Sequence, residues 1–189
     1  MRTVLLSMAP ALLLAGCGGP EPSSNSTAAA NVTGSASEAE KSPSAQIDRS
    51  HRGEAPPAIA FRLPDGTART IGDFGGTPVL VNLWATWCAP CKAEMPTLDA
   101  LAMREKGKLT VLTVSQDLQG ATAVQPYFAT SGFKALQPWL DPDVRFSTAF
   151  AATLPMTILY GADGRERWRA TGGMNWAGPE AAKLIAEAR

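Results

Sequence analysis

The sequence predicts an α/β domain in which a central mixed β-sheet is flanked by helices. Residues 78–84 form a near-continuous apolar run, which is typical of a central strand buried on both faces. Strand-like and helix-like segments alternate after it, as in a sheet that helices cover on both sides. The folded part is expected to extend from residue 54 to residue 189, a common length for one domain.

A β-hairpin is expected before the central strand. Residues 58–63 alternate apolar and polar side chains and lead into the turn signal Pro64-Asp65-Gly66, so residues 68–71 can return as the second arm. The other elements follow from apolar spacing and turn residues. They are helices at residues 89–102, 121–130, 143–151 and 179–188, and strands at residues 109–114, 156–160 and 165–170.

The composition leaves few classes of function open. The chain has 189 residues, with 17 Lys and Arg against 17 Asp and Glu, so it has no basic surplus for binding nucleic acid. Three cysteines are too few for a disulfide scaffold, and a single histidine excludes most histidine-rich metal sites. We therefore expect no nucleic-acid partner, no metal and no cofactor, and a chemistry that depends on cysteine.

The first residues are expected to be a targeting segment rather than part of the fold. Arg2 is followed by an apolar run at residues 4–14, shorter than the roughly 20 residues that span a membrane and typical of a signal peptide. The run ends in Leu14-Ala15-Gly16-Cys17, which resembles the lipobox of bacterial lipoproteins. This resemblance implies a signal peptide at residues 1–16 and a lipid on Cys17. The alternative is an ordinary secretory signal that leaves Cys17 as a free thiol.

A linker is predicted between Cys17 and the folded domain. Residues 18–52 are mostly small or polar, with Val32 and Ile47 as their large apolar residues, and cannot bury enough surface to offset the entropy of ordering. We therefore expect a disordered linker over residues 17–53, which tethers a periplasmic domain to the membrane through lipid. His51, near the end of this segment, is expected to be solvated.

Cys88 and Cys91 lie where the predicted central strand meets the next helix. A C-x-x-C motif beside a βαβ pattern is typical of a thioredoxin-like redox site. The free N–H groups and the dipole at a helix N-terminus favour the thiolate of Cys88, the nucleophile in thiol–disulfide exchange. Cys91 follows one helical turn later, within reach of Cys88, and Pro90 is tolerated in the first turn.

Three other interpretations of this motif carry less weight. Zinc needs four ligands, and the remaining Cys17 and His51 both precede the predicted domain. A c-type haem site would need a histidine after Cys91, where this chain has Lys92. A purely structural disulfide stays open, although so small a ring would constrain the unfolded chain little.

Residues 79–96 resemble the core motif of the TlpA/ResA family of membrane-attached, extracytoplasmic thioredoxin-like proteins. The most specific part is Trp87-Cys88-Ala89-Pro90-Cys91 with Glu94-Met95-Pro96, and Thr153-Leu154-Pro155 before an apolar strand matches a second landmark. The resemblance implies a thioredoxin-like fold with an N-terminal β-hairpin extension. It also implies a cis Leu154–Pro155 bond that faces the cysteines, where the Leu154 backbone could pair with an extended substrate chain.

The five tryptophans are expected to differ in their roles. Trp84 and Trp87 are expected to lie half in the core and half at the rim of the substrate surface, with Trp87 as a substrate-binding residue. Trp139, Trp168 and Trp176 are expected to have packing roles alone.

Asn82 and Glu94 bear on how the second cysteine gains and loses its proton. Asn82 stands where cytosolic thioredoxins carry a buried aspartate, and an amide cannot take a proton. Glu94 lies one helical turn after Cys91, and TlpA/ResA-like proteins have a glutamate at this position. We therefore expect Glu94 to be the acid or base for Cys91, with partial burial raising its pKa. A solvated helix carboxylate is the alternative.

The resemblance implies an extracytoplasmic thiol–disulfide oxidoreductase that reduces disulfide-bonded proteins of the cell envelope. Cys88 would attack the substrate and Cys91 would resolve the mixed disulfide. A membrane thiol donor of the DsbD/CcdA type would then return the pair to its reduced state. Two alternatives stay open. A copper-handling protein of this fold would have a distant histidine, and this domain has none after His51. A peroxidase would have a threonine where this chain has Ala85.

Overall fold

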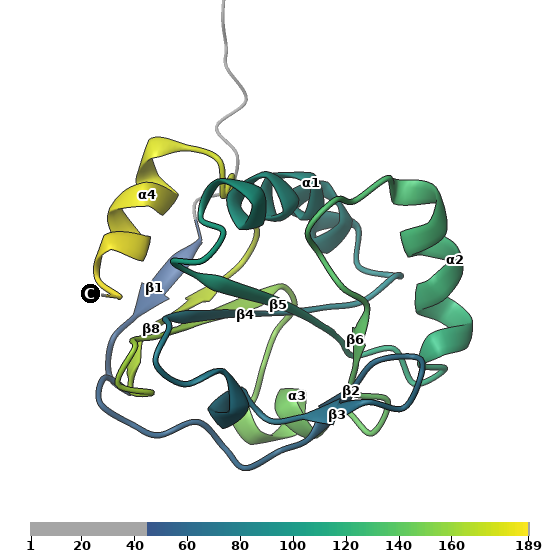
Figure 1. Ribbon diagram of the computed structural model, residues 1–189, viewed down its shortest axis with the longest axis horizontal. Helices are drawn as coiled ribbons and strands as arrows, with labels where there is room; N and C mark the ends of the chain where they lie inside the picture. Colours follow the sequence, from purple (N-terminus) through teal and green to yellow (C-terminus); the bar gives the residue numbers. More distant parts are fainter. Residues whose placement is uncertain (1–44, 189) are drawn as a thin grey trace, which may run out of the picture. The chain divides into compact units, whose positions relative to one another are not determined.

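In the computed structural model, residues 45–188 are described, and they build one eight-stranded sheet in the order β1-β8-β7-β4-β5-β6-β2-β3 (Figure 1). β4 (Val79–Trp84) lies in the middle of the sheet. It pairs in parallel with β5 (Thr110–Ser115) and antiparallel with β7 (Met156–Tyr160). The mixed sheet that the sequence predicts is therefore confirmed.

The outer strands are short. At one edge, β8 (Glu166–Thr171) pairs with β7 and with β1 (Gln46–Asp48). At the other edge, β6 (Trp139–Leu140) joins β5 to the hairpin formed by β2 (Phe61–Arg62) and β3 (Ala68–Arg69). This hairpin is the predicted N-terminal extension. Strands of two or three residues carry too few side chains for an alternating pattern, so the sequence does not predict β1 and β6.

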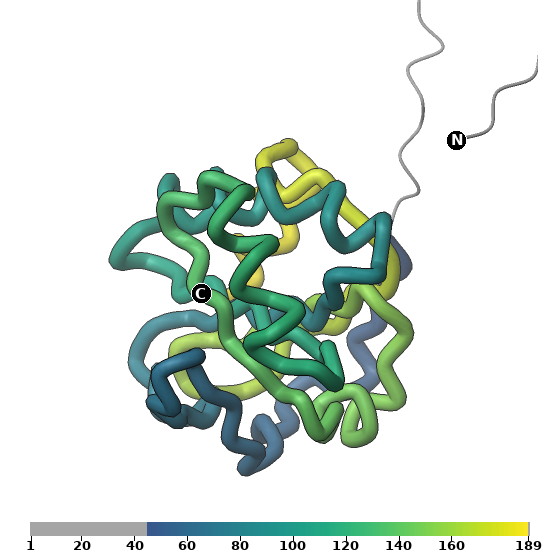
Figure 2. The backbone as a smooth tube through the Cα atoms, turned by 90° about the vertical axis from the view of Figure 1, so that its right-hand side faces the viewer, coloured from purple at the N-terminus to yellow at the C-terminus, as the bar shows by residue number. Residues whose placement is uncertain are grey.

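Helices cover both faces of the sheet, as predicted, and α2 lies toward the viewer in the turned view of Figure 2. One face carries α1, α2 and α4, and the other carries α3 and a 3₁₀-helix, η1. Their bounds are α1 (Ala89–Arg104), α2 (Ala121–Ser131), α3 (Arg145–Phe150), α4 (Pro179–Ala186) and η1 (Ile71–Phe74).

The side chains of β4 alternate between the two buried layers. Leu80 and Trp84 belong to the core under α1, whereas Val81 and Leu83 belong to the core on the α3 side. Every residue of the strand is buried. The apolar run is therefore the consequence of a strand that is covered on both faces. By the same alternation, Asn82 points toward α1.

The domain begins earlier than the sequence predicts. The predicted linker covers residues 17–53, but Gln46–Asp48 form β1, whose residues pair with Thr171, Ala170 and Arg169 of β8. The linker prediction is therefore wrong for this last part, because backbone pairing at a sheet edge needs no run of apolar side chains. The predicted signal peptide, Cys17 and the rest of the linker up to residue 44 lie outside the described residues.

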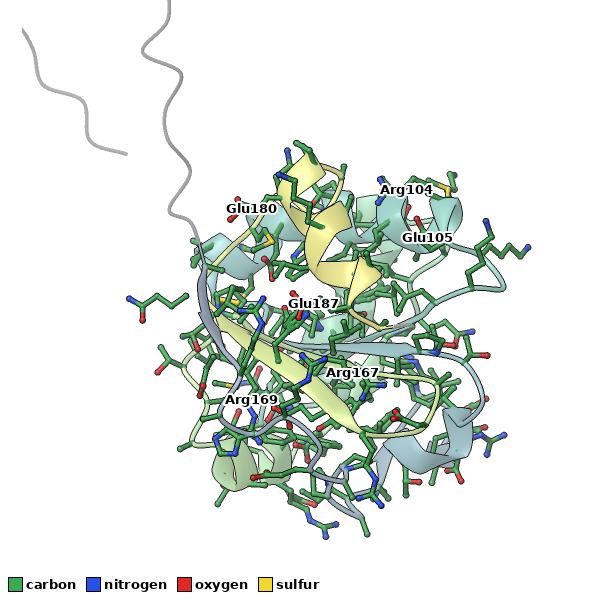
Figure 3. The ribbon with its side chains drawn as sticks, turned by 90° about the vertical axis from the view of Figure 1, so that its left-hand side faces the viewer. Arg104, Glu105, Arg167, Arg169, Glu180 and Glu187 are labelled. Carbon is green, nitrogen blue, oxygen red and sulfur yellow. A yellow bond between two sulfur atoms is a disulfide. The ribbon has the colours of Figure 1, made fainter. Side chains whose placement is uncertain are left out.

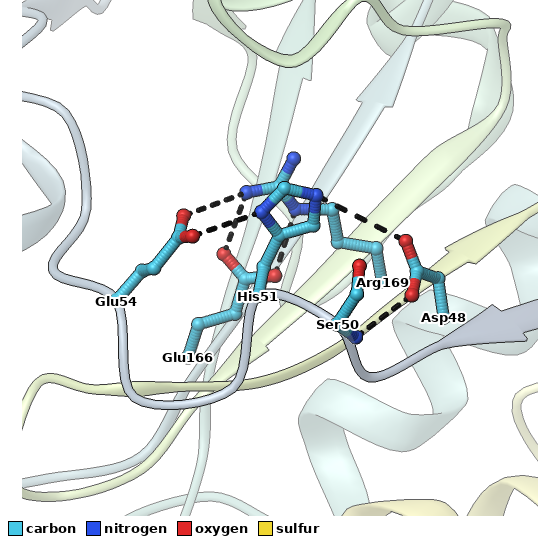
Figure 4. A network of polar contacts seen from close by, with 6 residues as sticks. All are labelled: Asp48, Ser50, His51, Glu54, Glu166 and Arg169. Carbon is cyan, nitrogen blue, oxygen red and sulfur yellow. Dashed lines mark hydrogen bonds and ion pairs between the residues drawn. The ribbon is translucent and has the colours of Figure 1, made fainter.

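Polar contacts hold the segment after β1 against β8 (Figure 4). The guanidinium of Arg169 makes two hydrogen bonds to the buried Glu166 carboxylate, at 2.7 and 3.0 Å, and lies 3.6 Å from Glu54. The His51 ring lies 3.1 Å from Glu54 and 4.0 Å from Asp48. His51 is thus a half-exposed member of a contact network.

Candidate active site

Cys88 and Cys91 are joined by a disulfide at the start of α1, with their Cα atoms 5.3 Å apart. Cys88 is the N-cap residue of the helix, and its sulfur accepts a hydrogen bond of 3.3 Å from the backbone N–H of Cys91. Pro90 occupies the first turn, where a missing N–H costs no hydrogen bond. The helix N-terminus therefore directs N–H groups at Cys88, which stabilises a thiolate there.

The two sulfur-bearing residues differ in exposure. Cys88 keeps 6% of its surface exposed, whereas Cys91 is fully buried and packs in the core with Trp84 and Met95. A substrate disulfide can therefore reach Cys88 but not Cys91. This difference supports Cys88 as the attacking thiol and Cys91 as the resolving thiol.

Asp117 fixes the turn that precedes the cysteines. Its carboxylate accepts hydrogen bonds from the backbone N–H of Thr86 at 2.9 Å, from the Thr86 hydroxyl at 2.6 Å and from the Ser115 hydroxyl at 2.8 Å. Asp117 itself is buried. The role of Asp117 cannot be predicted from local sequence patterns, because its partner Thr86 lies 31 positions away in the chain.

Glu94 is buried beneath α1, with 4% of its surface exposed. Its Oε1 accepts a hydrogen bond of 2.7 Å from the side-chain amide of Asn82. Its Oε2 accepts hydrogen bonds of 3.0 Å each from the backbone N–H of Met174 and the indole N–H of Trp176. The alternative of a solvated helix carboxylate is therefore wrong.

The charge of Glu94 is set by two opposing influences. Burial raises the pKa of its carboxyl group, and the hydrogen bonds from Met174, Asn82 and Trp176 lower it, with a net rise. A raised carboxyl pKa moves a glutamate toward the range in which it can exchange protons at neutral pH. Trp176 contributes to the site through this hydrogen bond, so the expectation that it has a packing role alone is wrong.

A groove lies beside the cysteines, where the resemblance places the substrate. The Leu154–Pro155 peptide bond is cis, as expected. A cavity of about 390 Å³ extends from Leu154 and Pro155 past Thr171 to Pro90 of the C-x-x-C motif. Gln46 of β1 also lines it, so the unpredicted strand contributes to the wall of the groove.

The two tryptophans near the motif divide between core and surface. Trp87, directly before Cys88, is 71% exposed. Trp84 is fully buried and packs against Tyr127 and Phe128 of α2. The expectation that both lie half in the core is therefore wrong, because strand alternation turns Trp84 inward while Trp87 lies in the turn.

Gly172 closes the end of β8 next to the groove. Its φ of +100° lies in the region that favours glycine, and its N–H donates a hydrogen bond of 2.9 Å to the carbonyl of Pro155. This bond ties the proline loop to the connection between β8 and α4. The next residue, Gly173, lies against Pro90 and Glu94.

Comparison with known proteins agrees with this geometry. The family model described as Redoxin matches residues 51–185. Thioredoxin 1 of Chlorobaculum tepidum is 36% identical over 87 residues, which is 44% of this chain and 84% of that protein. The thiol:disulfide interchange protein DsbE of Pseudomonas fluorescens is 51% identical over 55 residues, which is 27% of this chain and 29% of that protein.

Solved structures of similar fold include StoA from Bacillus subtilis. It superposes with a TM-score of 0.57 at 19% identity, covering 71% of this chain and 98% of StoA. These findings agree with the resemblance of residues 79–96 to TlpA/ResA-like proteins. The chain therefore belongs to the Redoxin family, has a thioredoxin-like fold and is a thiol–disulfide oxidoreductase of the thioredoxin type.

Proposed function

We propose that the protein reduces disulfide bonds of envelope proteins outside the cytoplasm. The observation that carries this proposal is the unequal exposure of the cysteine pair: Cys88 is reachable at a helix N-terminus, and Cys91 is buried one turn behind it. Such a pair can attack a foreign disulfide and then resolve the product within the same chain.

The first step is attack by the Cys88 thiolate on one sulfur of a substrate disulfide. The substrate S–S bond breaks, one substrate sulfur leaves as a thiolate, and Cys88 is joined to the other in a mixed disulfide. The helix N-terminus stabilises the Cys88 thiolate before attack. Trp87, the Leu154 backbone and Pro155 bind the substrate chain around the broken bond, since Leu154 and Pro155 line the groove and Trp87 is exposed directly before Cys88.

The second step releases the substrate. Glu94 accepts the proton of the Cys91 thiol, and the resulting thiolate attacks the sulfur of Cys88. The Cys88–Cys91 bond forms, and the second substrate sulfur leaves as a thiolate. Two electrons have passed from the cysteine pair to the substrate. Glu94 suits this role because it is buried one helical turn from Cys91 and has a raised pKa.

A membrane thiol donor of the DsbD/CcdA type would restore the dithiol, and a lipid on Cys17 would hold the protein near it. The support for the anchor is the sequence Leu14-Ala15-Gly16-Cys17 after an apolar run. Among residues 45–188, no helix has the length and apolar character to cross a membrane.

The disulfide chemistry is tested by reducing insulin with the purified, reduced protein and following the precipitation of the free B chain. Cys88→Ser is expected to abolish the reaction, because it removes the attacking thiolate. Cys91→Ser is expected to stop after the first step and accumulate mixed disulfides, which can be captured from cells and identified. Cys17→Ser, which lies outside the pair, is the matched control. Full activity of Cys88→Ser would refute the mechanism.

The anchor is tested separately by growing cells with labelled palmitate. The wild-type protein is expected to incorporate label and to sediment with membranes, whereas Cys17→Ser is expected to do neither. An unlabelled wild-type protein would contradict the lipid on Cys17 and leave the disulfide chemistry untouched.

A further inference from the structure

Residues 172–178 connect β8 to α4, and three hydrogen bonds join them to Glu94 and Thr97 of α1. The backbone N–H of Met174 and the indole N–H of Trp176 both donate to Oε2 of Glu94, at 3.0 Å each. The backbone N–H of Trp176 donates to the Thr97 hydroxyl at 3.1 Å. The connection therefore holds Glu94 directly and also holds the next turn of its helix.

Trp176 has a neighbour of the same kind with a different partner. The rings of Trp176 and Trp168 stack with centroids 6.4 Å apart and planes 11° apart, and both residues are fully buried. The indole N–H of Trp168 donates to the backbone carbonyl of Leu184 at 3.1 Å, which satisfies the end of a helix. The indole N–H of Trp176 instead donates to the carboxylate of Glu94, an ionisable group. Packing of the ring in the core does not require this hydrogen bond.

We propose that Trp176 is a positioning residue that fixes the Glu94 carboxylate on the buried side of α1, one turn from Cys91, and sets the pH range in which it accepts the proton of that thiol. This inference rests on the proposed function, in which Glu94 is the proton acceptor.

The hydrogen bonds determine where the proton can go. A carboxylate has about four lone-pair sites, and three N–H groups occupy three of them at Glu94. Oε2 carries two of these bonds and Oε1 carries one, from Asn82. The free site is therefore on Oε1, and the indole N–H keeps Oε2 occupied in both charge states.

The groups that surround the Glu94 carboxylate are uncharged. Asn82 approaches from β4, with Thr157 of β7 behind it at 2.9 Å from the same amide nitrogen. Met174 and Trp176 approach from the connection, and Cys91 lies one turn earlier on α1 itself. No charged side chain of the described residues is among the causes of the raised pKa of Glu94. The indole bond therefore acts on Glu94 without competition from an ion pair.

A cavity beside Glu94 offers a route by which its carboxyl group can exchange the proton with solvent. About 310 Å³ of space lies against Glu94 and is bounded by Pro90 on the motif side and by Gly173, Met174 and Asn175 of the connection. The connection that orients the carboxylate thus also forms one wall of its access to solvent.

The test separates the two cysteine steps in the full chain carrying Cys17→Ser, in which Cys88 and Cys91 are the two remaining cysteines. The reduced protein is mixed with an equal amount of dithiobis(nitrobenzoate). Attack by Cys88 releases one coloured thiolate, and attack by Cys91 on the mixed disulfide releases the second. The rate of the second release is measured by stopped flow across pH.

Trp176→Phe is expected to shift the midpoint of the second release upward by about one to two pH units, the effect of losing one hydrogen bond to a charged group. Trp168→Phe, which removes an indole N–H of the same stack without touching Glu94, is expected to leave the midpoint within a few tenths of a unit. Glu94→Gln is expected to remove the transition that Glu94 causes and to leave the pH dependence of unassisted thiolate formation at Cys91. Adding Trp176→Phe to Glu94→Gln should change nothing further.

The outcomes distinguish the two proposals. A wild-type transition in Glu94→Gln would overturn the role of Glu94 and, with it, this inference. Loss of the transition in Glu94→Gln together with equal midpoints for Trp176→Phe and Trp168→Phe would overturn the inference alone. Should Trp176→Phe fail to fold, benzothienylalanine at position 176 keeps the ring size and removes the N–H, and carbon NMR of the Glu94 carboxyl gives the same comparison in the oxidised protein.

Discussion

At Glu94, burial and hydrogen bonding act on one carboxyl group in opposite directions. The side chain is buried in the layer between α1 and the sheet, which disfavours its charged form. Three N–H donors, one from β4 and two from the β8–α4 connection, favour that form. The net result is a pKa above the usual range of glutamate, with the charge still stabilised at a defined place.

The raised pKa of Glu94 makes stability depend on pH. A group whose pKa is higher in the folded than in the unfolded state stabilises the fold at low pH, and that stability is lost as pH rises through the folded pKa. We therefore expect the free energy of unfolding of the oxidised wild type to fall, relative to Glu94→Gln, as pH rises from the usual range of glutamate. Urea unfolding of both proteins at several pH values measures the difference. Parallel curves for the two proteins would contradict the raised pKa.

Asn82→Asp tests the amide that faces Glu94. The Asn82 nitrogen lies 2.7 Å from Oε1 of Glu94, so aspartate would place a second carboxyl group at that distance. Two carboxylates this close cannot both ionise easily, and they titrate as a coupled pair. We expect one low and one strongly raised apparent pKa in carbon NMR of the side-chain carboxyl groups. Thr157→Val, which removes the other partner of the Asn82 amide, is the control and should keep one transition for Glu94.

At the scale of elements, the start of α1 carries the three residues of the proposed reaction. Cys88 caps the helix, Cys91 lies in its first turn and Glu94 in its second, so one face of one helix presents all three to the sheet. The helix continues through Pro96, which has no N–H to donate to the carbonyl of Lys92. The Thr97 hydroxyl donates to the carbonyl of Glu94 at 2.7 Å and accepts from Trp176, which links this part of α1 to the β8–α4 connection.

The turn between β4 and α1 depends on β5 through Asp117. Asp117→Asn is expected to lower the free energy of unfolding by about 1–3 kcal/mol, because an amide cannot accept the three bonds that reach the buried carboxylate. Amide hydrogen exchange at Thr86 and Trp87 should also become faster. Asp143→Asn, at an exposed position, is the control and is expected to change stability by less than about 0.5 kcal/mol. Equal effects of the two substitutions would show that Asp117 does not hold the turn.

At the scale of the whole domain, the first and last described segments meet at the same edge of the sheet. β1 extends the sheet beyond β8. Arg49, directly after β1, forms an ion pair with Glu187, which follows α4 and is labelled in Figure 3. The ion pair between the partly buried Arg169 and the buried Glu166 lies on β8, next to β1 (Figure 4). β1, the edge strand that contributes to the groove, is thus held in place by backbone hydrogen bonds to β8 and by the ion pair that follows it.

Arg169→Ala is expected to destabilise the domain by about 3–5 kcal/mol, since it leaves the buried Glu166 carboxylate without its partner. Replacing both residues together, by Arg169→Met and Glu166→Leu, should recover most of that loss. Arg49→Ala removes a more exposed pair and is expected to cost less than about 1 kcal/mol. Urea unfolding of the wild type and the three variants measures these differences. If Arg169→Ala lowers the free energy of unfolding no more than Arg49→Ala does, the argument from the buried charge of Glu166 is refuted.

Much of this protein follows from short-range patterns. The apolar run of β4, the C-x-x-C motif at the start of α1 and the sequence Leu154-Pro155 are each readable from adjacent residues, because a strand's burial, a helix cap and a turn depend on neighbours within a few positions. They suffice for the α/β fold, the order of the longer elements and the reactive pair. The bounds of β7 agree with the prediction for the same reason.

The tertiary structure decided what surrounds that pair. Trp176 and Met174 reach Glu94 across 82 and 80 positions of sequence, and Asp117 reaches Thr86 across 31. β1 is a strand because the edge of β8 offers unpaired backbone groups, not because its own residues favour one. These contacts form only when the sheet brings distant segments of the chain side by side. The sequence alone therefore determined the redox pair, and the tertiary structure determined the groups that surround it.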